Sequence, residues 1–328
     1  MLRIGILGVG YLGKIHINCI RKIKDFDLIG FYDINSDISE KISNELNIKA
    51  FKDIDELIDS VDVVDIVTST TSHFQCAVKS ISKGKHIFIE KPVVATFEEA
   101  CKLQEIASHT NSKIQIGHVE RFNPAFIAAD RFIENPTFIE VHRLAPYNVR
   151  GADVPVTLDI MIHDIDILLH IVNSKIKHIS ACGLPIVSKT PDITNARIEF
   201  ENGAAANLTA SRLSLKKIRK CRIYQPNGYI IIDYLQQIAE MVSFTDNIDY
   251  KDPFAMIVNG VEGYDTPRQI NFSKLDITKN NAIETELRSF HDSIVTDSVP
   301  IVNLDDGLKA FNIAITINNL VENFIDNN

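Results

Sequence analysis

The sequence has little that suits a membrane protein or a secreted scaffold. No apolar run reaches the roughly 20 residues that a membrane-spanning helix needs, and the first residues resemble a buried strand rather than a signal peptide. The cysteines lie far apart, and none forms a C-x-x-C pair, which argues against a disulfide framework and a cysteine zinc site. We therefore expect a cytoplasmic protein that does not associate with membranes. The five cysteines are Cys19, Cys76, Cys101, Cys182 and Cys221.

Basic residues are also scarce, with 34 Lys and Arg against 43 Asp and Glu and a net charge of −9. This charge argues against nucleic acid as a partner, although an acidic protein can still hold a local basic site for a phosphorylated substrate. The sequence contains no internal repeat and no low-complexity segment. What is present is the composition of a globular protein, 45% hydrophobic and 23% charged over 328 residues, which is enough for two domains.

The first 33 residues carry the clearest motif. An apolar strand over 2–7 is followed by Gly8-Val9-Gly10-Tyr11-Leu12-Gly13, a helical pattern, a second strand over 28–32 and then Asp33. In a G-x-G-x-x-G loop the first glycine allows a tight turn, the second lets a pyrophosphate approach the backbone, and the third lets the helix pack closely. The helix N-terminus supplies free N–H groups for the phosphates. The pattern predicts a dinucleotide site rather than a merely structural glycine turn.

Asp33 also indicates which dinucleotide binds. Its carboxylate, twenty residues after Gly13, is suited to accept hydrogen bonds from the adenosine ribose and would repel the 2′-phosphate of NADP. The residues that follow, 34–36, supply no arginine for such a phosphate. We expect the cofactor to be NAD.

The first third of the chain continues to alternate strands with helices. This alternation predicts an α/β fold with a doubly wound parallel sheet. After about residue 121 the pattern changes to strands joined by short turns, two of them Asn-Gly pairs at 202–203 and 227–228 that favour hairpins, so a largely antiparallel sheet is expected there. The segment 245–266 has no clear period. Further strands are expected at 61–68, 86–90, 113–119, 137–144, 177–183, 196–200, 204–211, 219–225 and 229–235, and helices at 37–46, 53–60, 72–82, 96–108, 157–171, 282–296 and 305–324, with one more beginning at Asn123-Pro124.

Lys91 is the first candidate catalytic residue. It follows the expected strand 86–90 within Glu90-Lys91-Pro92, and the carboxyl ends of parallel strands face the ligand crevice. An ammonium there can stabilise the negative charge that grows on a substrate oxygen as hydride leaves. The alternative is a solvated lysine in a turn.

Asp159 and His163 form the second candidate. They stand four residues apart on the expected helix, where a carboxylate can orient an imidazole and raise its basicity for general base catalysis. A surface ion pair is one alternative. A metal site is another, because His163, Asp166 and His170 also recur at helical spacing, but hydride transfer to NAD needs no metal if Lys91 is the electrophile, and we expect none.

Arg121 follows the last expected parallel strand, within Arg121-Phe122-Asn123-Pro124. It could hold a substrate phosphate or tie the two domains together, and the sequence favours neither. A substrate pyrophosphate would require Arg121, Arg143 and Arg150 to converge.

Together these motifs resemble the glucose–fructose oxidoreductase/inositol dehydrogenase (GFO/IDH/MocA) family over essentially the whole chain. The resemblance depends on the glycine fingerprint, on Thr68-Ser69-Thr70 with His73, on Glu90-Lys91-Pro92, on Asp159-x-x-x-His163 and on the segment 300–314. It implies an NAD-binding Rossmann domain over 1–121 and, over 122–328, a substrate-binding α+β domain whose large open sheet serves homodimer or homotetramer contacts.

The resemblance also implies residue roles. Lys91 and His163 would be catalytic, with Asp159 supporting the histidine, and Glu90 would contact the nicotinamide ribose. The expected substrate contacts are Lys91, Arg121, Asn123, Arg150, Asp159 and His163. The expected cofactor contacts are Gly8, Gly10, Tyr11, Leu12, Gly13, Asp33, Thr68, Ser69, Thr70, His73, Glu90 and Lys91.

Two runs, 117–125 and 159–166, resemble the branch of this family that acts on nucleotide-linked sugars. This implies an NAD-dependent dehydrogenase for a secondary hydroxyl, with C3 of UDP-N-acetylglucosamine as the expected position. A free cyclitol or monosaccharide is the alternative small-molecule substrate. A regulatory, non-catalytic NAD-binding protein is a third possibility, but such a protein would be expected to lose the lysine or the histidine.

Overall fold

A computed structural model describes residues 1–148, 154–249, 256–258 and 267–327 of the chain. The chain divides into two compact units, each made of two separate segments. The first unit comprises Met1–Phe122 and Asn281–Asn312, and the second comprises Asn123–Asn280 and Ile313–Asn328. The division after residue 122 lies one residue from the predicted boundary, but the return of 281–312 to the first unit differs from the prediction. Among the described residues no helix has both the length and the apolar composition needed to cross a membrane.

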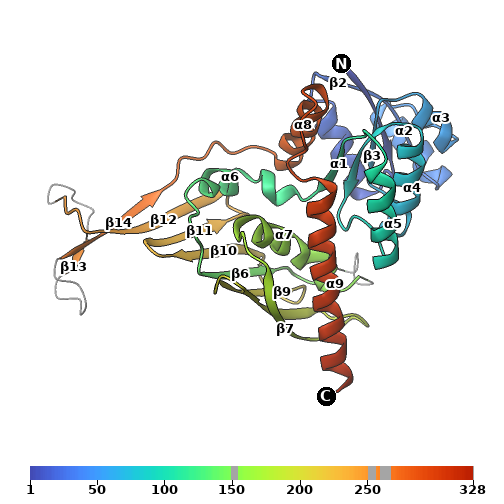
Figure 1. The fold of residues 1–328 in the computed structure, drawn as a ribbon. Helices are drawn as coiled ribbons and strands as arrows, with labels where there is room; N and C mark the ends of the chain where they lie inside the picture. Colours follow the sequence, from blue (N-terminus) through green and yellow to red (C-terminus); the bar gives the residue numbers. More distant parts are fainter. Residues whose placement is uncertain (149–153, 250–255, 259–266, 328) are drawn as a thin grey trace. The chain divides into compact units, whose positions relative to one another are not determined.

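The first unit, whose N-terminal segment is blue in Figure 1, contains a five-stranded sheet. Every neighbouring pair of strands is parallel, in the order β2-β1-β3-β4-β5. The strand order changes direction between β1 and β3, because β2 lies on one side of β1 and the later strands lie on the other, so the crevice at the carboxyl ends of β1 and β3 is where a ligand is expected. The doubly wound sheet predicted from the sequence is confirmed. Its strands are β1 (Leu2–Leu7), β2 (Phe26–Tyr32), β3 (Val63–Ile66), β4 (His86–Glu90) and β5 (Ile114–Gly117).

Helices follow each of the first four strands. α5 begins with the predicted capping box, because the Thr96 hydroxyl accepts the N–H of Glu99 while the Glu99 carboxylate accepts the N–H of Thr96. The helices of this unit are α1 (Tyr11–Ile20), α2 (Ser36–Leu46), α3 (Ile54–Asp59), α4 (Thr70–Ser82), α5 (Phe97–Ser108) and α8 (Ala282–Val295), with the 3₁₀ turn η1 (Val119–Phe122).

α8 belongs to the first unit because its apolar face completes the core of that unit. Leu287 and Phe290 are fully buried in one hydrophobic cluster with side chains of β1, α1 and β4, and the Phe290 ring lies 6.1 Å from that of Phe88. The Gln115 amide on β5 donates a buried hydrogen bond to the carbonyl of Glu286. Position in the sequence therefore does not decide which unit α8 belongs to, since this C-terminal helix covers an N-terminal sheet.

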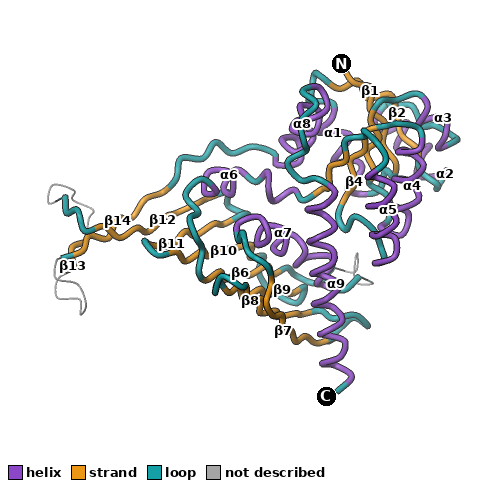
Figure 2. The backbone as a smooth tube through the Cα atoms, in the orientation of Figure 1, coloured by secondary structure: helices purple, strands orange, loops and turns teal. Residues whose placement is uncertain are grey.

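The described residues of the second unit form a nine-stranded sheet in the order β13-β14-β12-β11-β10-β6-β9-β8-β7 (Figure 2). All neighbouring pairs are antiparallel except β6 with β9, which confirms the predicted, largely antiparallel sheet. Both Asn-Gly pairs form hairpins, and Gly203 and Gly228 have φ angles of +89° and +145°. The strands are β6 (Phe138–Leu144), β7 (Ile176–Leu184), β8 (Ile193–Phe200), β9 (Ala205–Ser211), β10 (Ile218–Gln225), β11 (Gly228–Asp233), β12 (Ile238–Thr245), β13 (Met256–Val258) and β14 (Arg268–Lys274).

The last three of these strands were not predicted. β12 lies just after the final strand expected from the sequence, and β13 and β14 lie in or beside the stretch that had no clear period. Of the segment 245–266, residues 250–255 and 259–266 lie outside the described part of the chain.

Two shorter helices and half of a long one complete the second unit. α6 (Pro124–Asp130) begins with Asn123 as its N-cap and contacts β11 and β12. α9 (Leu304–Asp326) starts in the first unit and ends in the second. The predicted regular helix over 157–171 is instead a π-helical turn, η2 (Thr157–Met161), followed by α7 (Ile162–Ile171). Wide turns of this kind occur frequently at functional sites.

Candidate active site

The glycine loop between β1 and α1 has the three properties expected of a phosphate loop. Gly8 has a φ of +91°, and a Cβ there would meet the Val67 carbonyl oxygen at 2.7 Å. A Cβ on Gly13 would overlap the carbonyl oxygen of Gly8, so the helix packs against the turn only with glycine. At Gly10, in contrast, a Cβ would meet nothing within 4 Å. The open side of Gly10, next to the first N–H groups of α1, is therefore where we expect a pyrophosphate to bind.

Asp33, directly after β2, is anchored to this loop. Its Oδ2 accepts the N–H of Val9 at 2.9 Å, and its Oδ1 accepts the N–H of Asn35 at 2.9 Å. A carboxylate has about four lone-pair positions, so both oxygens keep the capacity to accept ribose hydroxyls. The carboxylate is thus fixed beside the glycine loop before any cofactor arrives.

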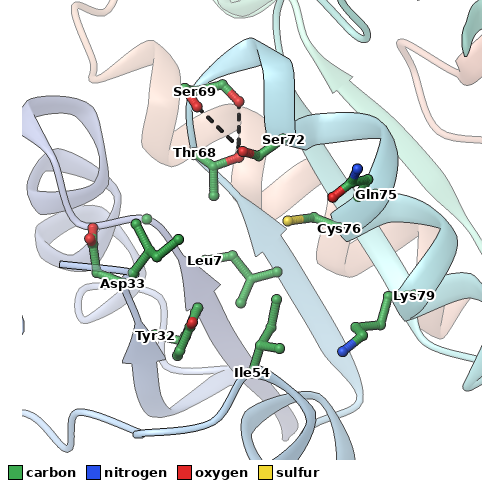
Figure 3. A pocket seen from close by; sticks show the side chains of 12 residues that line it. Leu7, Tyr32, Asp33, Ile54, Thr68, Ser69, Ser72, Gln75, Cys76 and Lys79 are labelled. Atoms are coloured by element: carbon green, nitrogen blue, oxygen red, sulfur yellow. Dashed lines mark hydrogen bonds between the residues drawn. The ribbon is translucent and has the colours of Figure 1, made fainter. Parts of the chain in front are cut away.

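A cavity of about 370 Å³ opens between Asp33 and α4 (Figure 3). In Figure 3, Tyr32 and Asp33 lie on one side of it and Gln75, Cys76 and Lys79 on the other. The Lys79 ammonium at the rim is 2.6 Å from a carboxylate oxygen of Asp55. The cavity lies at the carboxyl ends of β1, β2 and β3, where the adenosine half of a dinucleotide is expected. It is lined by Leu7, Gly8, Tyr32, Asp33, Ile34, Ile54, Thr68, Ser69, Ser72, Gln75, Cys76 and Lys79.

The Thr68–His73 turn borders this cavity. Thr68 and Ser69 line it, and Thr70 begins α4. His73 is buried, and its two ring nitrogens lie 2.8 Å from the carbonyl oxygen of Pro92 and 3.2 Å from that of Thr68. Burial lowers the pKa of His73, and the two carbonyl contacts act in the opposite direction. His73 therefore joins the end of β3 to the segment after β4.

Glu90 and Lys91 end β4 in the same unit. Glu90 is buried, and its Oε2 accepts the N–H of Lys91 at 3.2 Å. Lys91 is half-buried, and its peptide bond to Pro92 is cis. Tyr11 at the start of α1 is exposed, and Leu12 is half-buried. All twelve expected cofactor contacts thus lie at, or directly after, the carboxyl ends of parallel strands of one sheet.

Asp159 and His163 lie in the second unit, and both are half-buried. Asp159 belongs to the wide turn η2 and His163 to the first turn of α7. The expectation that they share a helical face assumed regular α-helical spacing, and the π-helical turn changes that geometry. Their catalytic roles remain predictions.

Arg143 does not fulfil the role that a substrate pyrophosphate would require. Its guanidinium is buried and binds both carboxylate oxygens of Asp164, with donor–acceptor distances of 2.6–2.9 Å. It also lies over the ring of Tyr234. This buried ion pair links α7 to β6. Loss of either partner would leave an uncompensated buried charge, so we interpret Arg143 as a structural partner of Asp164.

The remaining expected substrate residues differ in their surroundings. Arg121 is buried within η1, and its backbone N–H donates to the carbonyl of His118. Asn123 is buried as well, its Oδ1 capping α6 through the N–H of Ala125 and its Nδ2 donating to the carbonyl of Tyr234. Arg150 lies outside the described residues. Substrate contacts by these three residues remain predictions.

The set considered for a metal does not form a cluster. His170 contacts Asp130 at 3.2 Å, and Asp166 is buried. Within the described ranges no group of three or more His, Cys, Asp or Glu side chains is arranged to hold a metal ion.

Several site residues were missed in the sequence. Ser72, Gln75, Cys76 and Lys79 recur at helical spacing on the α4 face that borders the cavity, which is a signal that could have been read. His16, three residues after Gly13, points into the core instead of outward. Nothing in its local pattern indicated this.

Comparison with known proteins agrees with this geometry. A family model described as "Oxidoreductase family, NAD-binding Rossmann fold" matches residues 2–118, and one for the GFO/IDH/MocA C-terminal domain matches residues 146–231. UDP-N-acetylglucosamine 3-dehydrogenase of Acidithiobacillus ferrooxidans is 30% identical over 99% of this chain and 98% of that protein. This chain belongs to the GFO/IDH/MocA family. It is an NAD-dependent oxidoreductase, as predicted from the sequence.

Other relatives and solved structures extend the comparison. Myo-inositol 2-dehydrogenase of Thermotoga maritima is 25% identical, covering 94% of this chain and 93% of that protein. A solved structure of the Acidithiobacillus ferrooxidans UDP-N-acetylglucosamine 3-dehydrogenase matches with a TM-score of 0.88 at 29% identity, over 98% of each chain. Members with this fold therefore act on both nucleotide sugars and cyclitols.

Proposed function

We propose that this protein is an NAD-dependent dehydrogenase that oxidises a secondary hydroxyl of a nucleotide-linked amino sugar, namely C3 of UDP-N-acetylglucosamine. The full-length similarity to UDP-N-acetylglucosamine 3-dehydrogenase carries the proposal, because it spans both units at 30% identity. The inositol dehydrogenase that matches over a comparable length is 25% identical.

Three side chains have separate roles in the proposed oxidation. Lys91, at the end of β4, donates a hydrogen bond to the substrate oxygen and stabilises its negative charge. His163 accepts the hydroxyl proton at a ring nitrogen, and Asp159 supports that imidazole. The glycine loop and Asp33 would hold NAD, which would supply the acceptor for the hydride.

The diphosphate of the substrate needs cationic partners that Arg143 does not supply. Arg143 is bound to Asp164, so we assign the diphosphate to Arg121 and Arg150. Replacing Arg121 with Gln should raise KM for the nucleotide sugar more than it lowers kcat, because a ground-state contact is removed.

A cyclitol dehydrogenase is the second candidate, supported by the myo-inositol 2-dehydrogenase match over 94% of this chain. Purified protein with NAD should be screened against UDP-sugars and inositols, with reduction followed at the nicotinamide absorbance. We expect turnover with UDP-N-acetylglucosamine and thermal stabilisation by UDP in the presence of NAD, since a ligand that binds the folded state stabilises it. Lys91→Ala serves as the inactive control. Turnover of inositols without response to UDP compounds would replace the proposal with the cyclitol candidate.

We also propose that the protein forms a homodimer or homotetramer through the sheet of the second unit. Phe138, Tyr224 and Tyr229 form a half-buried row of rings across β6, β10 and β11, with centroid separations of 5.7 and 5.4 Å. Such a row suits a contact with a second copy. Sedimentation at several concentrations tests it, and a monomer at every concentration would contradict it.

A further inference from the structure

A buried imidazole in the first unit lies between two buried carboxylates. His16 of α1 has its Nδ1 2.9 Å from Oδ2 of Asp65 on β3 and its Nε2 3.2 Å from Oε1 of Glu90 on β4. The exposed fractions of His16, Asp65 and Glu90 are 0%, 0% and 7%. Three titratable groups from three elements therefore meet in the core, and of these only Glu90 is an expected cofactor contact.

Proton counting restricts how this cluster is charged. A neutral imidazole has one N–H and one lone pair, and here both ring nitrogens face carboxylate oxygens. The lone pair would repel whichever carboxylate it faced, unless that carboxyl carried a proton. With His16 as an imidazolium, both contacts become attractive, and the cluster has a net charge of −1.

The surrounding groups favour that imidazolium. Burial by itself would lower the pKa of His16, but Asp65 and Glu90 outweigh it and raise the pKa well above its ordinary value. Burial would raise the pKa of Glu90, yet His16 and, more weakly, Lys91 and His73 lower it. The other groups that face the imidazole are the edge of the Phe88 ring and, on its own helix, the Cys19 thiol.

The Glu90 carboxylate is also confined from its other sides. Oε2 accepts the N–H of Lys91, and a Cβ at Gly117 on the neighbouring strand β5 would stand 2.9 Å from both carboxylate oxygens. Only glycine at 117 leaves room for this carboxylate. Asp33 and Gly10 would hold the adenosine and the pyrophosphate of NAD, and in the strand order β2-β1-β3-β4 the nicotinamide half would then lie toward β4, which ends at Glu90.

We propose that Asp65 and His16 are positioning residues that hold Glu90 ionised and fixed beneath the nicotinamide half of NAD. Asp65 orients the imidazole through the hydrogen bond at Nδ1, and the imidazole holds Glu90 by charge attraction, with Nε2 3.2 Å from Oε1 but outside hydrogen-bond geometry. The carboxylate in turn fixes the backbone N–H of Lys91. The inference rests on the proposed placement of Glu90 at the nicotinamide ribose and not on the identity of the sugar.

Two ligands of different length test the proposal. Asp65→Asn and His16→Gln should weaken binding of NADH by on the order of tenfold, because each removes a buried polar partner and leaves the remaining groups less well satisfied. Binding of ADP, which occupies only the adenosine half, should not change. His86→Gln is the matched control, a histidine at the opposite end of β4 that accepts the N–H of Lys113. Equal losses for NADH and ADP, or no loss for NADH, would overturn the proposal.

Gly117→Ala perturbs the same carboxylate without touching the imidazole. It should reproduce the selective loss of NADH binding, and unchanged NADH affinity in this variant would show that the position of Glu90 does not matter to the cofactor. Thermal unfolding of each variant shows whether it is folded.

The cofactor-free protein gives a second, independent measurement. Ring-nitrogen NMR spectra distinguish imidazolium from neutral imidazole, and His16→Gln identifies the signal among the ten histidines. We expect His16 to remain an imidazolium at pH 8 and to become neutral there in Asp65→Asn. A His16 that is already neutral at pH 7 would contradict the proposal. None of these measurements uses a sugar, so failure to find a substrate leaves them valid.

Discussion

At the scale of single residues, Asp192 shows how one carboxylate can order a loop. Its Oδ2 accepts the N–H groups of Ile186, Val187 and Ser188 at 2.8, 2.6 and 2.8 Å, and the residue is fully buried. Burial would raise its pKa, but the three backbone donors lower that pKa from 3.8 to about 2. The turn between β7 and β8 thus depends on an ionised side chain.

This dependence predicts a change of stability with pH. A lowered folded-state pKa contributes stability above the ordinary value of 3.8, which is lost as the pH falls through about 2. Asp192→Asn should therefore destabilise the protein by about 2 kcal/mol at neutral pH, and the difference from the wild type should shrink in acid. Urea unfolding at several pH values measures it, with exposed Asp27→Asn as the control. A difference that is independent of pH would contradict the explanation.

Asp33 should determine which cofactor binds. NAD should bind much more tightly than NADP, because the carboxylate anchored to Val9 would repel the 2′-phosphate. Asp33→Ala should reduce that preference, by a few kcal/mol at most. Titration of both cofactors into each protein tests this. Tighter binding of NADP by the unmodified protein would refute it.

Residues differ in how far the sequence predicts them. The conformations of Gly8 and Gly13 were predictable because a tight turn and close helix packing each require glycine, whereas the cofactor contact of Asp33 stays a prediction. Arg143 was not, because its charge says nothing about whether it is already paired, and its partner Asp164 lies 21 residues away on another element. The burial of His16 between two carboxylates could not be predicted for the same reason, because both carboxylates come from later strands.

At the scale of elements, two substitutions in the glycine loop should separate an effect on protein stability from an effect on NAD binding. Gly13→Ala should destabilise the protein by about 3 kcal/mol, because its Cβ would overlap the Gly8 carbonyl. Gly10→Ala should leave stability unchanged, since its Cβ meets no protein atom, but it should weaken NAD binding by occupying the space of the phosphate.

Thermal unfolding with and without NAD measures both effects. If Gly10→Ala bound NAD normally, the pyrophosphate could not lie against that residue.

Elements were predictable where their own pattern decides them. Strands buried on both faces, such as β3, appear as continuous apolar runs, and hairpins follow Asn-Gly pairs. The π-helical turn η2 was not predictable, because the same residues fit a regular helix and the distinction depends on packing against β9. β13 and β14 form the outer end of the nine-stranded sheet, where weakly patterned strands pair with neighbours rather than with a core.

At the scale of the whole molecule, catalysis should depend on one residue from each unit. Lys91→Ala and His163→Ala should each lose roughly 100- to 10,000-fold in turnover while binding NAD almost normally, since each acts on the transition state. The double variant should lose less than the product, because both residues serve one proton transfer. Asp159→Asn should be milder.

Steady-state kinetics with the substrate found in the screen, together with NAD titrations, provide the test. Turnover of His163→Ala within a few-fold of the wild type would remove His163 from the mechanism and leave Lys91 or a water molecule as the base.

The return of residues 281–312 to the first unit governs how the protein folds as it is made. Domains commonly fold one after another as the chain emerges from the ribosome, the N-terminal one first. Here Leu287 and Phe290, which close the core over β1 and β4, are synthesised after the entire sheet of the second unit. The apolar surface of the nascent N-terminal segment that Leu287 and Phe290 cover therefore stays exposed until these two residues have been translated. The unit that binds the cofactor is begun first but is completed only after the sheet of the second unit has been synthesised.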